Sequence, residues 1–511
     1  MTESPHSNRL IAGREAFLFL LILGVAAVLY RHKLGFSDIW VDEACSKALI
    51  RYPLPEMLRL TAGDFHPPLY FIGLKLFTIL AGNTDVSIRL FSVLGALGTL
   101  AIAYLVGQRV FGKGGALCWC LLLLALPMPA LYSHIARMYT WAAFVTEAVF
   151  LYALLYAREH RSRDLFWLGC FSTMAAYLHY YCLIAAFGTS LTVLIYLLVR
   201  RDPAWRALAA MGVVVFVLFL PWLSVLLSQA RAAQKDFWIG PVSWATLLAC
   251  YTQPFAGLFR LFIGSFGLIA IIYGLTLIAL WMALVSRKAV DKLPLGLSLI
   301  VCHGTILTAV VVSFTLRPIL YPRYVMPLTP LLLVPPLVML LQWKRNWPRA
   351  LVLAAALGCG VFIMLLEFRF SYGPYRQSLE HLSQAHPEVK KIVHIAEITA
   401  GPFDEYGRGG RWRQYYLKNE GSSWYLNMDM FAGMRAIKGL EDVVDKNEVF
   451  CLAVFDNLPL NKGNIDLLLS QCQMLACDEV VDARPYPGIK IKLYVLKYRG
   501  AGFSQASGGS D

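Results

Sequence analysis

Charged residues are scarce in this sequence. Only 15% of the 511 residues are Asp, Glu, Lys or Arg, whereas 58% are hydrophobic, and the mean hydropathy is +0.58. This composition excludes a soluble protein of this length and indicates a polytopic membrane protein. The sequence also contains no nucleic-acid-binding motif, no metal-type CxxC pair and no His-rich tract, so nucleic acid is not an expected partner.

Cysteine provides no clear disulfide framework. Most of the 11 cysteines lie inside apolar segments, where they behave as small hydrophobic side chains. Cys472 and Cys477 lie in the C-terminal region instead. They are candidates for a disulfide in an oxidising compartment, but their spacing alone does not decide whether they pair.

Long apolar segments predict the membrane topology. No small-residue cleavage site follows the first apolar run before Arg31, so this run is expected to remain as an anchor helix. The later segments are each close to the ~20 residues that a spanning helix needs, which gives about eleven spans. The expected spans are residues 16–30, 86–108, 115–132, 138–157, 165–179, 181–199, 207–229, 260–286, 294–316, 324–342 and 350–368.

Basic residues predict the orientation of these spans. Sixteen Lys and Arg fall in one alternating set of loops and ends, and only six fall in the short loops of the other set. Because Lys and Arg stay on the cytoplasmic side, the N-terminus is expected in the cytoplasm. The protein itself is expected in the cell (inner) membrane. This threading requires residues 66–82 to form a helix in the outer interface rather than a span. The net charge of +14 fits anchoring to anionic membrane lipids.

The composition changes near residue 376. Strand-like runs such as EVFCLAVFDN and IKIKLYVLKY alternate with helix-like ones such as NIDLLLSQCQML. We therefore expect residues 1–375 to form a transmembrane domain, with a first outer loop at 31–85 that contains interfacial helices. Residues 376–511 are expected to form a small extracytoplasmic (periplasmic or extracellular) α/β domain.

Polar clusters gather at the outer ends of the spans. They are WVDEA (40–44), GDFHPPLYF (63–71), YSHIARMYTW (132–141), LHYYC (178–182), KDFWIGP (235–241) and RPILYPRYVMP (317–327). Arginine, histidine and tyrosine at a membrane surface are able to bind the phosphate of a lipid, and a carboxylate beside them is able to act as a general base. Taken singly, these residues also fit structural roles as interfacial aromatic residues, cationic anchors or packed histidines. The adjacent acids Asp42 and Glu43 favour function, because acids in an apolar context need a reason.

Six of these motifs together resemble a known family. WVDEA, HPPLYFIGLKLF, SIRLFSVLGALGTLAIAYLVGQRVFG, SHIARMYTW, LHYY and RYVMP follow one another with similar spacing in GT-C fold glycosyltransferases. The relevant members use a polyprenyl-phosphate-linked sugar and are related to protein O-mannosyltransferases and the aminoarabinose transferases of lipid A. The resemblance covers roughly residues 10–370 and is most specific in the first 140.

The resemblance implies roles for individual residues. The family's loop acid falls on Asp42, with Glu43 beside it, and both are expected to be catalytic. Residues expected to bind the donor phosphate are His66, Arg137, Tyr139, Arg323 and Tyr324, and residues expected to line the site or contact the acceptor are Tyr70, His179, Tyr180 and Trp238. The sequence departs from the family at Ile135, where an acid is usual, and this leaves no second acid from that loop.

The implied chemistry is an inverting transfer. Asp42 would accept the proton of an acceptor hydroxyl, which attacks the sugar opposite the lipid phosphate. The acceptor is a glycan, a lipid or a protein, and the residues do not identify it. Two kinds of site fit this residue set. One is a divalent metal ion near Asp42, Glu43 and a histidine, and the other is a base site without a metal. The need for a metal therefore stays open.

A transporter or lipid flippase is the alternative from another class of protein. Such proteins place ionisable residues near the midplane of repeated halves, whereas no internal repeat is visible here and the polar clusters lie at the outer ends. Glu147 is the exception, because it lies near the middle of a span and is a candidate to face His303. A role in holding helices together is the alternative for this pair.

Overall fold

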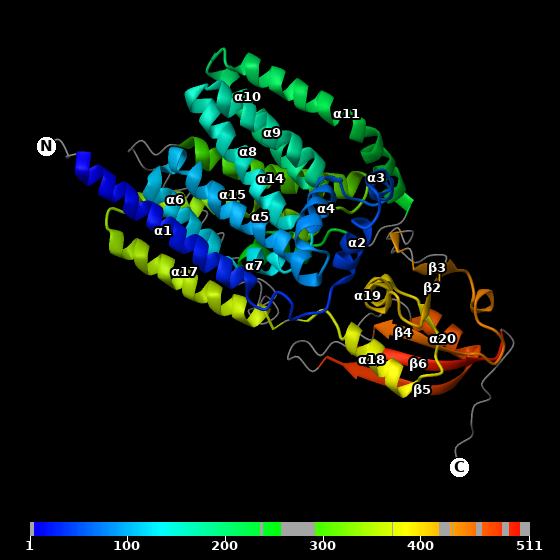
Figure 1. Cartoon of the computed structure of the whole chain (residues 1–511). Coiled ribbons are helices and arrows are strands. Elements are labelled where there is room, and N and C mark those ends of the chain that lie inside the picture. The colour runs from blue at the N-terminus through cyan, green and yellow to red at the C-terminus, as the bar shows by residue number, and fades with distance from the viewer. Residues whose placement is uncertain are drawn as a thin grey trace.

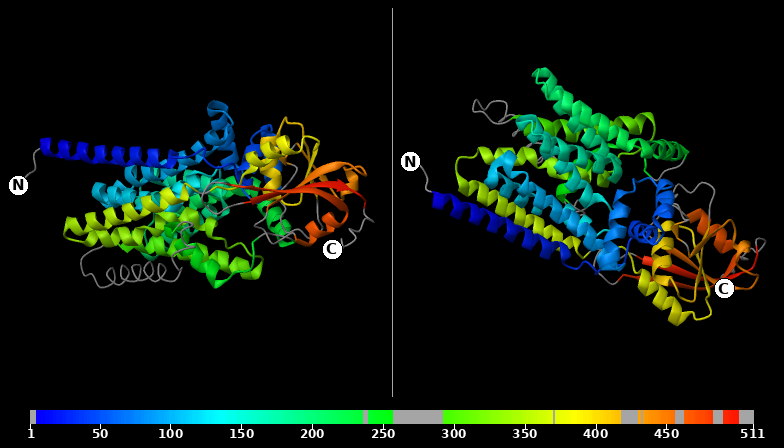
Figure 2. Two further views of the ribbon diagram at one scale, coloured as in Figure 1. Left: turned by 90° about the horizontal axis from the view of Figure 1, so that it is seen from below. Right: turned by 45° about the horizontal axis from the view of Figure 1, so that its top comes forward.

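The computed structural model describes residues 5–235, 239–256, 292–369, 371–417, 430–431, 433–455, 462–482 and 490–500. The chain forms a bundle of long helices and a smaller α/β domain (Figure 1). The N-terminus lies at one end of the bundle, and the C-terminal domain lies beyond the other end in all three views (Figures 1 and 2). The segment predicted to form the first outer loop lies beside the C-terminal domain, and we call this end of the bundle the outer end, after the predicted orientation.

Long apolar helices make up most of the bundle. Eight segments among the described residues are long and apolar enough to cross a membrane, and a bent pair raises this number to nine. The uninterrupted helices of this set are α1 (Pro5–Arg31), α5 (Asp85–Leu105), α8 (Tyr139–Glu159), α10 (Tyr180–Val199), α11 (Trp205–Lys235), α14 (Lys292–Thr315) and α17 (Asn346–Glu367). The chain is thus a multi-pass membrane protein, as its composition predicts.

The expected count of eleven spans is not confirmed. Helix α9 (Ser162–Leu178) has 17 residues and is shorter than the other spans, and residues 260–286 lie outside the described residues. The segment predicted at 115–132 is a pair of helices, α6 (Gln108–Leu124) and α7 (Pro127–Ser133), which meet at 66°. Pro127 begins the second of them, because proline lacks the N–H that a continuous helix requires.

Proline also divides the segment predicted at 324–342. It consists of the 3₁₀ helix η2 (Pro322–Leu328) and the short helices α15 (Thr329–Leu332) and α16 (Val334–Gln342). Pro327 lies inside η2, and Pro330 and Pro335 lie in the first turns of α15 and α16. The first turn tolerates proline because its N–H groups have no helical partner. This irregular backbone carries Arg323 and Tyr324 to the outer end of the bundle.

Helix α8 lies at the centre of the bundle. Most of its residues are buried, and it packs against α5, α9, α10 and η2. The close approach of α5 depends on Gly95, because a Cβ at this position would lie 2.7 Å from the Thr140 hydroxyl and 2.8 Å from the Trp141 amide nitrogen. Gly95 therefore fixes the distance between α5 and α8. Helix α5 follows the first outer loop, and helix α8 follows the α7–α8 turn.

Short helices cover the outer end of the bundle. They are α2 (Val41–Leu49), α3 (Leu54–Ala62), α4 (Leu69–Ala81) and α12 (Trp244–Ala256). Helix α4 follows Pro67 and Pro68 and has 13 residues, which is too short to span a bilayer. This length agrees with the interfacial helix expected at residues 66–82.

The C-terminal domain is built on a mixed sheet. Its strands have the order β3-β2-β1-β4-β6-β5 among the described residues, with parallel pairs from β3 to β4 and antiparallel pairs from β4 to β5. The strands are β1 (Lys391–His394), β2 (Arg413–Leu417), β3 (Met434–Ile437), β4 (Val449–Phe455), β5 (Cys472–Val481) and β6 (Lys490–Tyr498). The helices are α18 (Tyr375–Ala385), α19 (Glu397–Gly407) and α20 (Lys462–Ser470), and a short 3₁₀ helix, η4 (Leu440–Asp442), follows β3. The α/β domain is therefore confirmed.

Two details of this domain differ from expectation. The helical pattern of residues 464–475 holds only for α20, and the chain enters strand β5 at Cys472. Cys472 and Cys477 therefore lie on one extended strand, about 16 Å apart at ~3.3 Å per residue, which is far beyond the Cα separation of a disulfide. The disulfide considered from the sequence does not form.

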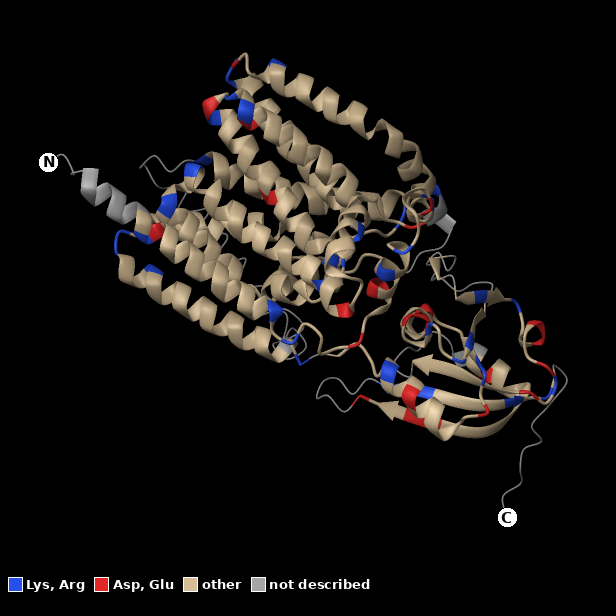
Figure 3. Ribbon diagram, viewed as in Figure 1, with Lys and Arg blue, Asp and Glu red and all other residues tan. Residues whose placement is uncertain are grey.

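Charge is unevenly distributed along the bundle. Figure 3 shows charged residues of both signs at the helix ends farthest from the C-terminal domain and again where the bundle joins that domain, with few between them. The orientation predicted from the Lys and Arg of the loops places the end farthest from the C-terminal domain in the cytoplasm.

We predict opposite locations for the α10–α11 turn and the C-terminal domain. A reporter fused after Asp202 should be cytoplasmic, and one fused after Gly500 should be external, because the basic residues around Asp202 resist translocation. Paired phosphatase and fluorescent-protein fusions measure this directly. Both reporters on the same side of the membrane would contradict the predicted threading.

Candidate active site

Residues from distant parts of the sequence meet at the outer end of the bundle. Asp42 and Glu43 lie in the first turn of α2, Arg137 precedes α8, and Arg323 and Tyr324 lie in η2. His66 precedes α4, and His179 separates α9 from α10. Each of these positions is a helix end or a break between helices. The backbone there turns, so side chains from separate helices can point into one space.

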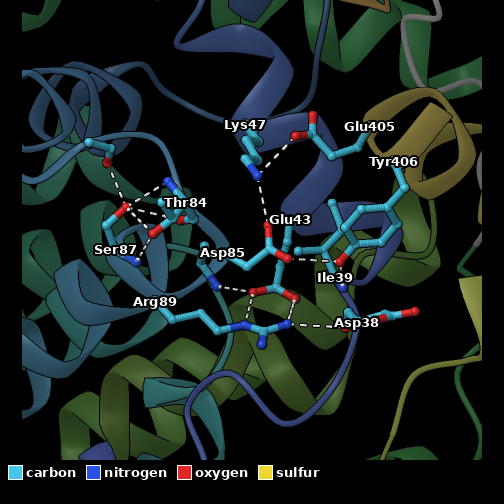
Figure 4. Close-up of polar contacts among 12 residues, drawn as sticks. Asp38, Ile39, Glu43, Lys47, Thr84, Asp85, Ser87, Arg89, Glu405 and Tyr406 are labelled. Atoms are coloured by element: carbon cyan, nitrogen blue, oxygen red, sulfur yellow. Dashed lines mark hydrogen bonds and ion pairs between the residues drawn. The ribbon is translucent and has the colours of Figure 1, made fainter. Parts of the chain in front are cut away.

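Glu43 anchors the first outer loop. Its carboxylate is fully buried and accepts two hydrogen bonds of 2.8 Å from Arg89, one to each oxygen (Figure 4). The backbone N–H groups of Trp40 and Ala136 donate to the same carboxylate at 3.0 Å. The Trp40 contact caps the start of α2, and the Ala136 contact ties α2 to the α7–α8 turn. With four donors, the Glu43 carboxylate is a structural anchor in this structure, and its predicted catalytic role stays a prediction.

Arg89 completes this anchor from within helix α5. Its guanidinium is nearly fully buried and also donates to the backbone carbonyls of Leu34 and Ser37 at 2.9 Å and of Asp38 at 3.1 Å. Together with the two bonds to Glu43, these contacts use all five N–H donors of the side chain. Arg89 therefore holds the loop that precedes α2 as well as α2 itself.

Asp42, the neighbour of Glu43, points into the cluster instead. Its Oδ2 accepts a hydrogen bond of 2.9 Å from Arg323 Nη1, and the side chain keeps 13% of its surface exposed. Burial by itself would raise the pKa of the Asp42 carboxyl, but the guanidinium groups of Arg323 and Arg137 hold that pKa below its ordinary value. Asp42 is thus an ionised carboxylate that a substrate is able to reach.

Arg137 is buried beside Asp42 with weak hydrogen bonds. Its Nη1 lies 3.5 Å from the Asp42 carbonyl oxygen, its Nη2 lies 3.4 Å from His66 Nδ1, and its Nε has no partner among the described residues. Burial and the adjacent Arg137 lower the pKa of His66, so this imidazole is neutral at pH 7. His66 Nδ1 also lies 3.3 Å from a carboxylate oxygen of Asp64. A buried guanidinium with unused donors is suited to bind an anion.

Aromatic side chains surround these charges. The Tyr324 ring lies 5.4 Å from the His179 ring and 6.3 Å from the His66 ring, and it packs 5.6 Å from the Arg323 guanidinium. Tyr139 is buried, and its hydroxyl has no hydrogen-bond partner within the described part of the chain. An apolar hollow begins beside Tyr139 and is lined by residues that include Tyr132, Thr140, Ala143, Met326 and Pro330.

Two predicted lining residues do not join this cluster in the structure, and a third lies outside the described residues. Tyr70 is buried against Phe71 and Phe91, with its hydroxyl 3.5 Å from the Ser92 hydroxyl, which is a packing role. Tyr180 belongs to a separate apolar cluster. Its hydroxyl accepts a hydrogen bond of 3.2 Å from Trp222 Nε1 and donates one to Gln229 Oε1. Trp238 lies outside the described residues.

The C-terminal domain contacts the other face of α2. Lys47 is buried between Asp85 at 2.7 Å and Glu405 of α19 at 2.9 Å (Figure 4). The Tyr406 hydroxyl accepts from the Ile39 amide at 2.8 Å and donates to Asp85 at 2.9 Å. The helix that carries Asp42 is thus fixed by α5 on one side and by the C-terminal domain on the other.

The candidate metal ligands Asp42, Glu43 and a histidine do not converge within the described part of the chain. The carboxylate of Glu43 faces Arg89 rather than Asp42 or a histidine. Within the described ranges, the one group of three His, Cys, Asp or Glu side chains with ligand atoms within 4.8 Å of one another is formed by His381, His386 and Asp478 in the C-terminal domain. The Asp42 cluster provides no such group.

Sequence reasoning missed the anchor and its supports. Arg89 lies in the SIRLF motif, inside an apolar span, and a buried charge in such a span is a signal of a specific partner. Asp64 lies in the polar cluster GDFHPPLYF but is not among the predicted site residues. Nothing local to Lys47 or Glu405 indicates that they meet, because 358 residues separate them in the chain.

Comparisons with known proteins show what the chain resembles in sequence and in fold. A family model described as dolichyl-phosphate-mannose-protein mannosyltransferase matches residues 65–225, which include Arg89, Arg137 and His179. The crystal structure of ArnT from Cupriavidus metallidurans bound to undecaprenyl phosphate is similar, with a TM-score of 0.58 and 15% identity. The apo structure of the same protein gives 0.59 and 15%, and in both cases 93% of this chain and 97% of that chain are covered. A search of curated proteins finds no match. The predicted GT-C fold is therefore confirmed.

We predict that the Arg89 anchor is required for stability. Arg89→Ala leaves the Glu43 carboxylate buried without its charge partner, which should cost about 3–5 kcal/mol of folding free energy. Thermal unfolding of the purified protein in detergent measures the loss as a lower Tm. Arg59→Ala is the matched control, because Arg59 forms an exposed ion pair on α3 and its loss should leave the Tm nearly unchanged. Equal Tm values for the two variants would contradict the anchoring role.

Proposed function

We propose that the chain is an inverting glycosyltransferase that moves a sugar from a polyprenyl phosphate to a hydroxyl group on the outer face of the membrane. The observation that carries this proposal is the convergence of one ionised carboxylate, Asp42, with two arginines, Arg137 and Arg323, at the outer end of the bundle. The similarity in fold to ArnT, which was crystallised with undecaprenyl phosphate, supports a lipid phosphate as the donor.

Asp42 is the proposed general base. It takes the proton from the acceptor hydroxyl while the oxygen forms a bond to the anomeric carbon of the sugar. The bond from this carbon to the phosphate oxygen breaks on the opposite face, and the electron pair leaves with the polyprenyl phosphate. The reaction needs no general acid, because the phosphate is already a good leaving group. It also consumes no redox partner.

Arg137, Tyr139 and Arg323 are the proposed phosphate ligands. Arg137 Nε and the Tyr139 hydroxyl are buried donors without partners among the residues described, and both flank the cluster. Preorganised donors of this kind stabilise the charge that develops on the leaving phosphate. The apolar hollow beside Tyr139 provides a nonpolar surface next to the polar groups, which suits a lipid attached to the phosphate.

The ion pair between Arg323 and Asp42 creates a conflict for catalysis. An arginine at 2.9 Å lowers the basicity of the carboxylate that has to accept a proton. This conflict is resolved if Arg323 turns to the phosphate when the donor binds, since the phosphate is the stronger anionic partner. Asp42 would then lose its partner and regain basicity only in the loaded enzyme. The exchange also prevents the site from activating water before a donor is present.

The transporter alternative loses its principal evidence. Glu147 is fully buried and has no hydrogen-bond partner among the described residues, while His303 is exposed on α14 with its Nδ1 2.8 Å from a carbonyl of its own helix. No hydrogen bond joins the two residues within the described part of the chain, so the pairing considered from the sequence receives no support.

We predict that Asp42→Asn abolishes most of the transfer. The change keeps the size of the side chain but removes the proton acceptor, so the rate should fall by ~10²–10⁴-fold. The measurement is transfer of a radiolabelled sugar from a lipid phosphate donor to envelope acceptors by the purified protein. Glu56→Gln, an exposed change on the neighbouring helix α3, should retain full activity. Full transfer by Asp42→Asn would remove the base role.

We predict that Arg137→Gln weakens binding of polyprenyl phosphate by ~10-fold or more, because a buried charge-assisted contact contributes at least ~1.4 kcal/mol. Calorimetry or a competition assay with undecaprenyl phosphate in detergent measures the affinity. Tyr139→Phe should have a smaller effect in the same direction, because it removes one neutral donor. Arg59→Gln serves as the control for nonspecific loss of positive charge. Unchanged affinity in Arg137→Gln would reduce Arg137 to a structural residue.

A further inference from the structure

Two histidines and two carboxylates gather on the C-terminal domain, away from the Asp42 cluster. His381 Nε2 lies 2.8 Å and His386 Nε2 lies 2.7 Å from the same oxygen of Asp478. His381 lies on α18, His386 directly follows this helix, and Asp478 lies on β5. The group therefore joins the helix to an edge strand of the sheet.

A carboxylate also lies on the other side of the His386 ring. His386 Nδ1 lies 3.5 Å from a Glu388 carboxylate oxygen, so both ring nitrogens of His386 face carboxylate oxygens. A neutral imidazole carries one N–H. When this N–H is on Nδ1, the Nε2 lone pair points to the space between His381 and Asp478.

We infer that His381, His386 and Asp478 bind a divalent transition metal ion such as Zn²⁺. Two imidazole nitrogens and one carboxylate oxygen are a common ligand set for zinc, and a water molecule completes four-coordination. In this arrangement Glu388 accepts the Nδ1–H of His386, which directs the Nε2 lone pair to the metal. A carboxylate behind a ligating histidine is a frequent outer partner in such sites.

The observed distances fit this site after a small movement. Ligand atoms about 2.0–2.2 Å from a zinc ion lie about 3.3 Å from one another in a tetrahedron. The three ligand atoms here lie within 4.8 Å of one another, with the two nitrogens 2.7–2.8 Å from the oxygen. His381 is 43% exposed, so its ring is able to move outward by the roughly 0.5 Å or more that the metal requires.

The position of this group gives the metal a structural role. Helix α18 also carries Arg376, whose guanidinium contacts Asp38 at 3.5 Å and pairs with Asp85 in the transmembrane domain. Its other end would be held to β5 by the metal. Occupancy therefore stiffens the helix that links the sheet to the first outer loop, independently of any step in sugar transfer.

The experiment measures zinc in the purified full-length protein. After removal of loosely bound metal by dialysis, the wild type should retain one equivalent of Zn²⁺ more than His386→Gln and Asp478→Asn. Glu388→Gln removes an outer partner and should weaken zinc binding by ~10–100-fold. His386→Gln and Asp478→Asn each remove a ligand and should weaken it by more. Added Zn²⁺ should also raise the Tm of the stripped wild type but not of the two ligand variants.

His160→Gln is the matched control. His160 pairs with Asp202 at 3.0 Å on the opposite end of the molecule. This pair contains one histidine rather than two, so it should bind no zinc. Its zinc content should equal that of the wild type. A wild type that binds no zinc, or equal zinc content in all variants, would overturn the inference. Gel filtration and circular dichroism establish that each variant is folded, and His381→Gln provides a third ligand variant if one fails.

Discussion

The buried ion pair between Glu43 and Arg89 is the contact on which the outer end of the molecule depends. It neutralises two charges inside an apolar environment, and the remaining donors of Arg89 hold three carbonyl groups of the loop that precedes α2. Removal of either partner leaves an uncompensated buried charge, which is far more costly than the loss of an exposed pair. The loop therefore has one stable path, and α2 has one stable position.

This fixed position determines what Asp42 is able to do. Two adjacent acids have opposite environments, because Glu43 points into the anchor while Asp42 points to Arg323 and Arg137. On the far side of α2, Lys47 contacts Glu405, so the C-terminal domain restrains the same helix. A carboxylate on such a rigid helix loses little entropy when a substrate binds, which is the benefit of preorganisation in catalysis.

The sequence predicted the membrane class, a short helix within residues 66–82, the α/β domain and several of the residues that meet around Asp42. Hydropathy and motif order carry this information, because they depend on segments of a few residues. The bend at Pro127, the broken segment around Arg323 and strand β5 were missed, since tertiary packing decides them. The anchoring contacts of Glu43 were missed as well: a DE pair does not reveal which acid faces the cluster, and the partner Arg89 is 46 residues away.

The most direct test of this account is a structure of the protein with a polyprenyl phosphate bound. The account predicts that the phosphate lies within hydrogen-bond distance of Arg137 and Arg323, and that the Arg323 guanidinium has left Asp42 to make this contact. The Glu43–Arg89 pair should be unchanged. A phosphate bound elsewhere, with the 2.9 Å contact between Arg323 and Asp42 intact, would contradict the proposed exchange of partners and the assignment of Asp42 as the base.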